Sequence, residues 1–278
     1  MVVSILPQSF FTDRIAGDRV RTSVLVGPGQ NPHNYEPSPR QIADLAETRL
    51  WILSGTEFEI SLRPKIEALF PALLIVDGAE GVIFRALEEH DHAEEDGDHK
   101  TEAVPDFNYD RHTWLGAEPA KIMAGHIRDA LCALDSEGAA LFETNYNGLI
   151  ADIDGLFAAL RAELAPLRGR TVFVYHPSFG YFLDEFGLVQ EAVETGGKEP
   201  TPRALGDLIA QAKAEGAAAV FVQAQFPVQT ARTVADAVGA AIVPLDPLAA
   251  DWLDNIRVMG DALKRALAPG AAFGEAGE

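Results

Sequence analysis

The sequence contains a single cysteine, Cys132, among 278 residues. One thiol excludes an intramolecular disulfide framework and the thiolate-rich zinc and iron–sulfur sites. Basic residues are also scarce, because 22 Lys and Arg stand against 42 Asp and Glu, and the net charge is −20 at pH 7. Such a chain is unsuited to nucleic-acid phosphates or an anionic membrane surface, so the charge favours a cationic partner.

No apolar run approaches the roughly 20 residues that a membrane-spanning helix needs. The chain opens on a predicted strand, without a charged and apolar leader ahead of a cleavage site. We therefore expect either a cytosolic protein or the mature length of an exported one with an initiator Met added. With 47% hydrophobic residues, 15 Phe and 3 Trp, the composition excludes global disorder and suits one large domain or two of ordinary size.

Short segments rich in Val, Ile and Leu alternate with longer segments of helical periodicity. Four precede residue 80 and three follow residue 170: Val2–Leu6, Thr22–Val26, Leu50–Ser54, Leu73–Val76, Thr171–Tyr175, Ala218–Gln223 and Ala241–Leu245. Strands separated by helices indicate parallel sheets that are buried on both faces. The segment Ser136–Leu167 reads as one long helix with Ser136 as its N-cap and Gly169 after its end.

These patterns predict an α/β fold with two lobes joined by the long helix. The expected boundaries are 1–135 for the first lobe, 136–167 for the helix and 168–278 for the second lobe. A repeat supports two related lobes, since Glu36-Pro-Ser-Pro-Arg40 recurs 163 residues later as Glu199-Pro-Thr-Pro-Arg203. In each copy a Ser or Thr can cap a helix whose first residue is Pro. Duplication is the interpretation we favour over chance recurrence of a common turn.

Histidines lie where open α/β sheets bind ligands, at the carboxyl ends of strands. His33 lies in a Pro- and Gly-rich loop after the strand that ends at Val26, and His176 directly follows the strand that ends at Tyr175. Asp246 has the same placement after the last strand. A single His at a strand end is usually an ordinary hydrogen-bonded residue, and an Asp there can cap a helix. Their combination, split between the lobes, is what indicates a metal site.

Two further histidines lie in sequence expected to be ordered. His112 follows an acidic segment and precedes a helix expected to start near Glu118, whereas His126 lies in the middle of that helix and reads as ordinary helix surface. The acidic segment, residues 88–102, holds eight acids, one Lys and the remaining histidines, His90, His92 and His99. It has no apolar period, so we expect a mobile solvated loop over 88–103.

Several motifs together resemble the ZnuA/TroA-like (cluster A-I) metal-binding proteins of ABC transporters, in particular the zinc type (ZnuA/AztC-like). They are Pro32-His33-Asn-Tyr-Glu-Pro-Ser-Pro39, Asp110-x-His112-x-Trp114, Tyr175-His176-Pro-Ser-Phe-Gly-Tyr181, the second Glu-Pro-Thr-Pro turn and the Asp246 loop. The resemblance covers nearly the whole chain. It implies two Rossmann-like lobes joined by one long rigid helix, with one divalent metal bound in the cleft by His33, His112, His176 and Asp246.

The resemblance also implies which metal is bound. Family members selective for manganese tend to carry Glu where this chain has His176, and zinc carriers have His. Imidazole suits Zn²⁺, whereas Mn²⁺ favours carboxylate oxygen. Several zinc carriers of the family have a disulfide in the second lobe, which the single Cys132 excludes here.

The function implied is that of a periplasmic solute-binding protein, with its signal peptide absent from this chain, that captures Zn²⁺ and delivers it to a membrane ABC permease. We expect a monomer that is not an enzyme and binds no nucleic acid. His90, His92 and His99 are then expected to capture zinc or to dock a periplasmic zinc donor (metallochaperone); the alternative is a surface insertion that only adds charge. Two other functions stay open: a zinc metallohydrolase with a three-His site and a bound water, or a periplasmic zinc buffer or adhesin on the same fold.

Overall fold

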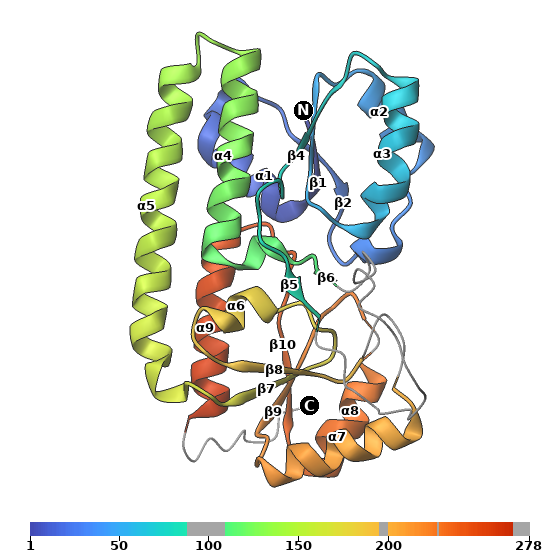
Figure 1. Cartoon of the computed structure of the whole chain (residues 1–278), viewed down its shortest axis with the longest axis vertical. Coiled ribbons are helices and arrows are strands. Elements are labelled where there is room, and N and C mark those ends of the chain that lie inside the picture. Colours follow the sequence, from blue (N-terminus) through green and yellow to red (C-terminus); the bar gives the residue numbers. More distant parts are fainter. Residues whose placement is uncertain (88–108, 195–199, 227, 269–278) are drawn as a thin grey trace, which may run out of the picture.

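Two parallel four-stranded sheets form the framework of the protein. The computed structural model describes residues 1–87, 109–194, 200–226 and 228–268, so the expected loop over 88–103 and its three histidines lie outside the described residues. The first sheet has the order β2-β1-β3-β4 and the second β10-β9-β7-β8. Figure 1 shows the two sheets one above the other, with helix α5 running alongside both.

The strands that form the two large sheets are β1 (Val2–Ile5), β2 (Ser23–Val26), β3 (Leu50–Leu53), β4 (Leu74–Asp77), β7 (Thr171–Val174), β8 (Val189–Ala192), β9 (Ala219–Val222) and β10 (Ala241–Pro244). All seven predicted strands are confirmed to within one residue at each end. Each residue of β1, β3 and β9 is buried, because central strands of parallel sheets have helices on both faces.

The helices are α1 (Leu6–Ala16), α2 (Pro39–Ala46), α3 (Glu57–Leu69), α4 (Ala117–Leu134), α5 (Ala139–Leu164), α6 (Gly180–Asp184), α7 (Pro202–Ala214), α8 (Gln229–Val238) and α9 (Trp252–Leu267). A small two-stranded sheet pairs β5 (Arg85–Ala86) with β6 (Tyr109–Asp110). Within the described ranges, no helix is both long and apolar enough to cross a membrane.

The two sheets have the same strand order. In each, the first strand in the chain lies between the second and the third, and the fourth lies outside the third. The repeated motif falls at the same place in both, since α2 follows the second strand of one sheet and α7 the second strand of the other. Ser38 accepts a hydrogen bond from the Gln41 N–H, and Thr201 accepts one from the Ala204 N–H. Both predicted caps are therefore confirmed, and the shared topology supports duplication.

One hydrophobic core runs through both halves of the molecule. It includes residues of both sheets together with α1, α4, α5 and α9. The rings of Phe11 and Trp252 meet edge to face, with centroids 5.0 Å apart. The indole of Trp252 donates a hydrogen bond to the Trp114 carbonyl (2.7 Å), and the indole of Trp114 donates one to the Pro247 carbonyl (2.7 Å). These contacts hold the facing ends of the two sheets in a fixed relation.

One prediction about local structure needs correction, and one strand is missing from the predicted set. The long helix begins at Ala139, not Ser136, and its N-cap is Gly138 without a side-chain cap. The reason is Asp135, whose Oδ1 accepts a hydrogen bond from the Gly138 N–H (3.2 Å) and so closes a turn before the helix starts. Strand β8 was not predicted, because the polar residues Gln190 and Glu191 interrupt its apolar pattern.

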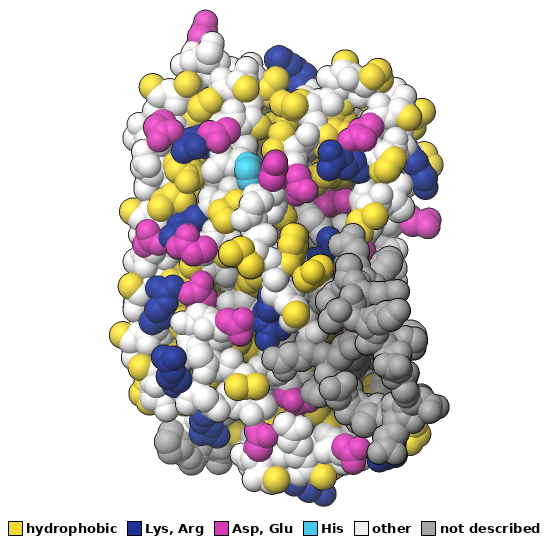
Figure 2. Space-filling model, in the orientation of Figure 1, with side chains coloured by type: hydrophobic (Ala, Val, Ile, Leu, Met, Phe, Trp, Pro, Cys, Tyr) yellow, Lys and Arg dark blue, Asp and Glu magenta, His cyan; other side chains and the backbone are white. Residues whose placement is uncertain are grey.

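On the face drawn in Figure 2, Asp and Glu side chains are interspersed with Lys and Arg and gather in no single patch. Several of these acids are paired, such as Asp135 with Arg19 (2.7 Å) and Asp154 with Lys121 (2.8 Å). The distribution of charge on this face therefore does not locate a cation site.

Candidate metal centre

His33 is held in a short 3-10 turn, Pro32–Asn34, that follows strand β2. The Asn31 side chain caps this turn by accepting a hydrogen bond from the His33 N–H (2.9 Å). After the turn, the Tyr35 hydroxyl donates a hydrogen bond to the Leu25 carbonyl (2.5 Å). The loop is thus tied back to the end of its own strand, which fixes the position of the His33 backbone.

His112 lies between strand β6 and helix α4, just before the 3-10 turn Thr113–Leu115. Asp110 holds it, because its Oδ1 accepts hydrogen bonds from both the His112 backbone N–H (2.9 Å) and Nδ1 (2.8 Å). Asp110 is fully buried and His112 is 5% exposed. This segment places an imidazole between the two sheets.

His176 directly follows strand β7 of the second sheet. Gln223, at the end of the neighbouring strand β9, clamps the turn by donating to the His176 carbonyl (2.7 Å) and to Ser178 Oγ (2.9 Å). The Gln223 side-chain oxygen also accepts from the His176 N–H (3.3 Å). His176 therefore lies at the carboxyl edge of its sheet, as its position after the strand predicts.

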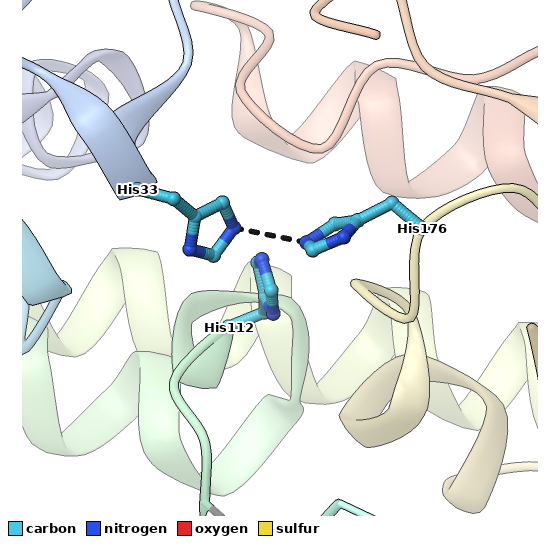
Figure 3. A group of neighbouring side chains, drawn as sticks. All are labelled: His33, His112 and His176. Carbon is cyan, nitrogen blue, oxygen red and sulfur yellow. Dashed lines mark hydrogen bonds between the residues drawn. The ribbon is translucent and has the colours of Figure 1, made fainter. Parts of the chain in front are cut away.

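These three histidines form one cluster. One ring nitrogen from each lies within 4.8 Å of the others, and the Nε2 atoms of His33 and His176 are 2.9 Å apart. Figure 3 shows the three imidazoles, carried by separate segments of the chain, pointing toward a common centre. The side chains are buried or half-buried. Among the described residues, no other group of three or more His, Cys, Asp or Glu is spaced to hold a metal ion.

Each imidazole is bound on its outer side by a carboxylate. His33 Nδ1 lies 2.9 Å from Glu57 Oε2, and His176 Nδ1 lies 2.5 Å from Glu194 Oε2, just as His112 Nδ1 meets Asp110. An Nδ1–H that donates to a carboxylate leaves Nε2 as the free donor atom and makes it more basic. The arrangement of the three pairs therefore presents Nε2 atoms to the centre.

The protonation states of His176 and Glu57 at neutral pH suit metal binding. The pKa of His176 is lowered to about 4, chiefly by burial; the neighbouring His112 and His33 also lower it, and the hydrogen bond with Glu194 opposes them. Burial opposes ionisation of Glu57, but its hydrogen bond with His33 outweighs this, and its pKa falls to about 2. At pH 7, His176 is thus a neutral imidazole that can coordinate a metal, and Glu57 is an ionised hydrogen-bond acceptor.

The donor set fits zinc. Zn²⁺ binds imidazole nitrogen at about 2.0–2.1 Å in a tetrahedral shell, which puts ligand nitrogens roughly 3.4 Å from one another. The three donor atoms all lie within 4.8 Å of one another, so small movements of the side chains would bring them to that spacing. An apolar wall adjoins the cluster, since the Phe226 ring stacks on His176 with centroids 4.4 Å apart. Limited access of water strengthens electrostatic interactions within such a site.

Asp246 lies outside the cluster. Its Oδ1 accepts hydrogen bonds from Gln225 Nε2 (2.9 Å) and from the Leu248 N–H (2.9 Å), which closes an Asx-type turn. Asp246 is not the cap of the last helix either, because α9 begins at Trp252 and is capped by Asp251. Coordination by Asp246 stays a prediction, and it would require Oδ1 to give up Gln225 or Oδ2 to turn inward.

The remaining histidines are apart from this cluster or lie outside the described residues. His126 is on α4, where its Nε2 bonds the Glu80 carbonyl (2.9 Å), so it is ordinary helix surface as predicted. His90, His92 and His99 are not among the described residues. The three carboxylates were missed by sequence reasoning, although Asp110 belongs to a motif that was noted for His112.

Comparison with known proteins gives a family for the whole arrangement. The family model described as "Zinc-uptake complex component A periplasmic", ZnuA, matches residues 1–266. A crystal structure of a ZnuA deletion mutant with zinc bound is 34% identical, with a TM-score of 0.85 over 96% of this chain and 97% of that one. The high-affinity zinc uptake system protein ZnuA of Brucella abortus is 27% identical over an alignment of 304 positions, gaps included, which covers 96% of this chain and 91% of that protein.

A longer relative is also similar. The zinc-binding lipoprotein AdcA of Streptococcus pneumoniae is 26% identical over 256 residues, which are 89% of this chain and 50% of that protein. The chain thus spans about half the length of this relative. Two open parallel sheets with a cluster of three histidines where they meet define the architecture of a two-lobed protein that could hold a metal ion between its sheets. The match over nearly all its residues shows that the chain belongs to the ZnuA family.

Proposed function

We propose that this protein works in the periplasm, where it binds one Zn²⁺ between its two sheets and delivers the ion to a membrane ABC permease. The observation that carries the proposal is the set of three imidazoles, each backed by its own carboxylate. Relatives whose names describe zinc uptake support the choice of metal and of process. Binding and handing over the ion, with no chemistry on a substrate, is then the whole task.

Ligand chemistry favours zinc over manganese. Three neutral nitrogen donors suit a borderline-soft ion that accepts tetrahedral coordination, whereas Mn²⁺ prefers oxygen donors and higher coordination. His176 contributes to this preference because it supplies an imidazole nitrogen and not a carboxylate oxygen, and its lowered pKa keeps that nitrogen unprotonated well below pH 7. Calorimetry with each metal alone should give a far tighter Kd for Zn²⁺. Comparable affinities for the two metals would contradict the argument.

Asp246 is the proposed fourth ligand. Its carboxylate accepts a hydrogen bond from Gln225, and Gln225 lines the cavity beside the imidazoles together with Phe226 and Leu248. Four protein ligands close a zinc shell, and an open fourth position is typical of catalytic zinc. Asp246→Asn should weaken zinc binding without abolishing it and should change the visible spectrum of bound Co²⁺. An unchanged Co²⁺ spectrum would instead favour water in that position.

The second candidate function is a zinc metallohydrolase. It is favoured by one feature only, namely that three histidines cluster while Asp246 lies outside them. Zinc-loaded protein assayed with ester and peptide substrates separates the two functions. Turnover that disappears in His112→Ala would establish the hydrolase, and no turnover beyond a zinc-free blank supports the binding role.

The decisive experiment removes one imidazole at a time. His33→Ala, His112→Ala and His176→Ala should each weaken zinc binding by orders of magnitude in competition titrations with a chelator. His126→Ala is the matched control, because that side chain bonds only the Glu80 carbonyl on the surface and should leave the Kd unchanged. Unaltered binding in all three cluster variants would refute the proposed site.

The role of the acidic segment is a separate part of the proposal. We infer that His90, His92 and His99 capture zinc, or dock a zinc-donor protein, before the ion reaches the cluster. Deleting 89–102 should leave the cluster Kd nearly intact while lowering total zinc bound or the rate of transfer from a donor. Equal stoichiometry and equal transfer rates would show that the segment merely adds charge.

A sedimentation measurement of the zinc-loaded protein tests the expected monomer.

A further inference from the structure

A small hairpin connects the His112 segment with the opposite half of the molecule. Strands β5 and β6 pair antiparallel, with Arg85 opposite Asp110. Both precede α4 and α5, whereas α6 follows β7 of the second sheet. Figure 1 shows β5 and α6 as neighbours between the two sheets. Hydrogen bonds between the Tyr181 hydroxyl of α6 and both strands confirm this contact, so residues from both halves meet just behind His112.

A single hydroxyl from α6 bonds both strands of the hairpin. The Tyr181 hydroxyl accepts a hydrogen bond from the Arg85 N–H (2.9 Å) and donates one to the Asp110 carbonyl (3.0 Å). A second link runs beside it, since Arg85 Nε donates to Asp184 Oδ2 (2.9 Å). Burial raises the pKa of Tyr181 to about 12, so the hydroxyl keeps its proton throughout the neutral range.

The backbone of α6 also touches the carboxylate that holds His112. A Cβ added at Gly180 would lie 2.6 Å from Asp110 Oδ2 and 2.8 Å from Arg85 Nη1, closer than real Cβ atoms come. Asp110 Oδ2 is buried and has no hydrogen-bond partner in the described structure. The direction of this carboxylate is therefore set on one side by His112 and on the other by packing against α6.

We propose that Tyr181 is a positioning residue for the zinc ligand His112, acting through Asp110 from the opposite half of the molecule. Its hydroxyl fixes the Asp110 backbone, and the Asp110 carboxylate fixes both the backbone and the imidazole of His112. His33 and His176 have their own carboxylates and do not depend on this contact. The inference rests on the proposed function, because it assigns a role in holding zinc.

The test compares two hydroxyl deletions on the same hairpin contact. Tyr181→Phe keeps the ring and removes both hydrogen bonds. Tyr109→Phe is the matched control, since Tyr109 lies on β6 beside Asp110 and its hydroxyl makes no hydrogen bond in the described part of the chain. Release of zinc into excess chelator should be about tenfold faster in Tyr181→Phe, the effect of about 1.4 kcal/mol lost from buried polar groups. Release from Tyr109→Phe should match wild type.

Imidazole nitrogen NMR of the zinc-free protein separates positioning from general destabilisation. In Tyr181→Phe the His112 nitrogens should shift toward mixed tautomers while those of His33 and His176 keep their wild-type values. Gly180→Ala, which displaces Asp110 by contact instead of by a lost hydrogen bond, should give the same pattern. Wild-type release together with wild-type His112 signals in both variants overturns the inference, and so do equal shifts at all three histidines. If wild type fails to bind zinc, the proposed function is refuted, whereas the NMR comparison still decides the role of Tyr181.

Discussion

Two buried groups in the zinc-free protein have pKa values that are shifted in opposite directions from their ordinary values. Burial lowers the pKa of His176 from 6.5 to about 4. Burial raises the pKa of Glu59 from 4.5 to about 7, despite hydrogen bonds that its carboxylate accepts from the Ser54 and Gly55 N–H groups. Both residues are buried, at 7% and 3% exposure, so water screens neither effect strongly. Their contributions to stability between pH 5 and 7 can be worked out separately.

For His176, lowering the pH from 7 to 5 protonates the unfolded chain before the folded one, because the folded-state pKa is the lower of the two. Stability therefore falls, by about 2 kcal/mol over this interval. For Glu59 the pKa is higher in the folded state than in the unfolded chain. Lowering the pH from 7 to 5 therefore protonates the buried carboxylate in the folded protein and removes the cost of keeping it ionised there. Stability therefore rises, also by about 2 kcal/mol. In wild type the two contributions nearly cancel.

Single substitutions should reveal each contribution. His176→Gln leaves the Glu59 effect alone, and this variant should be about 2 kcal/mol more stable at pH 5 than at pH 7. Glu59→Gln leaves the His176 effect alone and should be about 2 kcal/mol less stable at pH 5. Urea unfolding of chelator-treated protein at both pH values measures the difference within each variant, so hydrogen bonds lost at both pH values drop out. The same pH difference in wild type and both variants would refute the reasoning.

Further predictions concern two glycines. A Cβ at Gly260 would lie 2.5 Å from Leu160, so Gly260→Ala should cost about 1–3 kcal/mol in urea unfolding. Gly155 lies on α5, and a Cβ added there would have no heavy atom within 4 Å. Gly155→Ala should therefore be tolerated and should raise the free energy of unfolding by up to about 1 kcal/mol. A lower free energy of unfolding would contradict the open space at this position.

Much of the fold is readable from the sequence, because buried parallel strands are nearly continuous apolar runs. Strand β8 escapes this signal for a definite reason. Its buried Gln190 accepts a hydrogen bond from the Phe179 N–H (2.9 Å), so a polar residue there satisfies the backbone of the turn after His176. A pattern of apolar residues cannot predict a polar side chain that is buried to bond a turn from another part of the chain.

The candidate site divides in the same way. His33 and His176 are predictable because topology places the ends of parallel strands at one edge. The carboxylates that bond these two histidines are brought to them by tertiary contacts that the sequence does not reveal. Glu57 reaches His33 from the first turn of α3, and Glu194 follows the unpredicted β8. No sequence spacing relates either acid to its histidine, whereas Asp110 lies two residues from His112 and could have been proposed from that spacing alone.

The shared core limits how the site can change. Separating the sheets as rigid bodies would expose Trp114 and Trp252. Both are fully buried, and each indole donates a hydrogen bond to a carbonyl of a distant segment of the chain. At roughly 200 Å² for each indole and about 25 cal/mol per Å², that exposure costs on the order of 10 kcal/mol. A transition that a binding event drives ordinarily involves only a few kcal/mol. We therefore expect any change in zinc affinity to arise in the loops that carry the histidines and Asp246, with the sheets as a fixed frame for those loops.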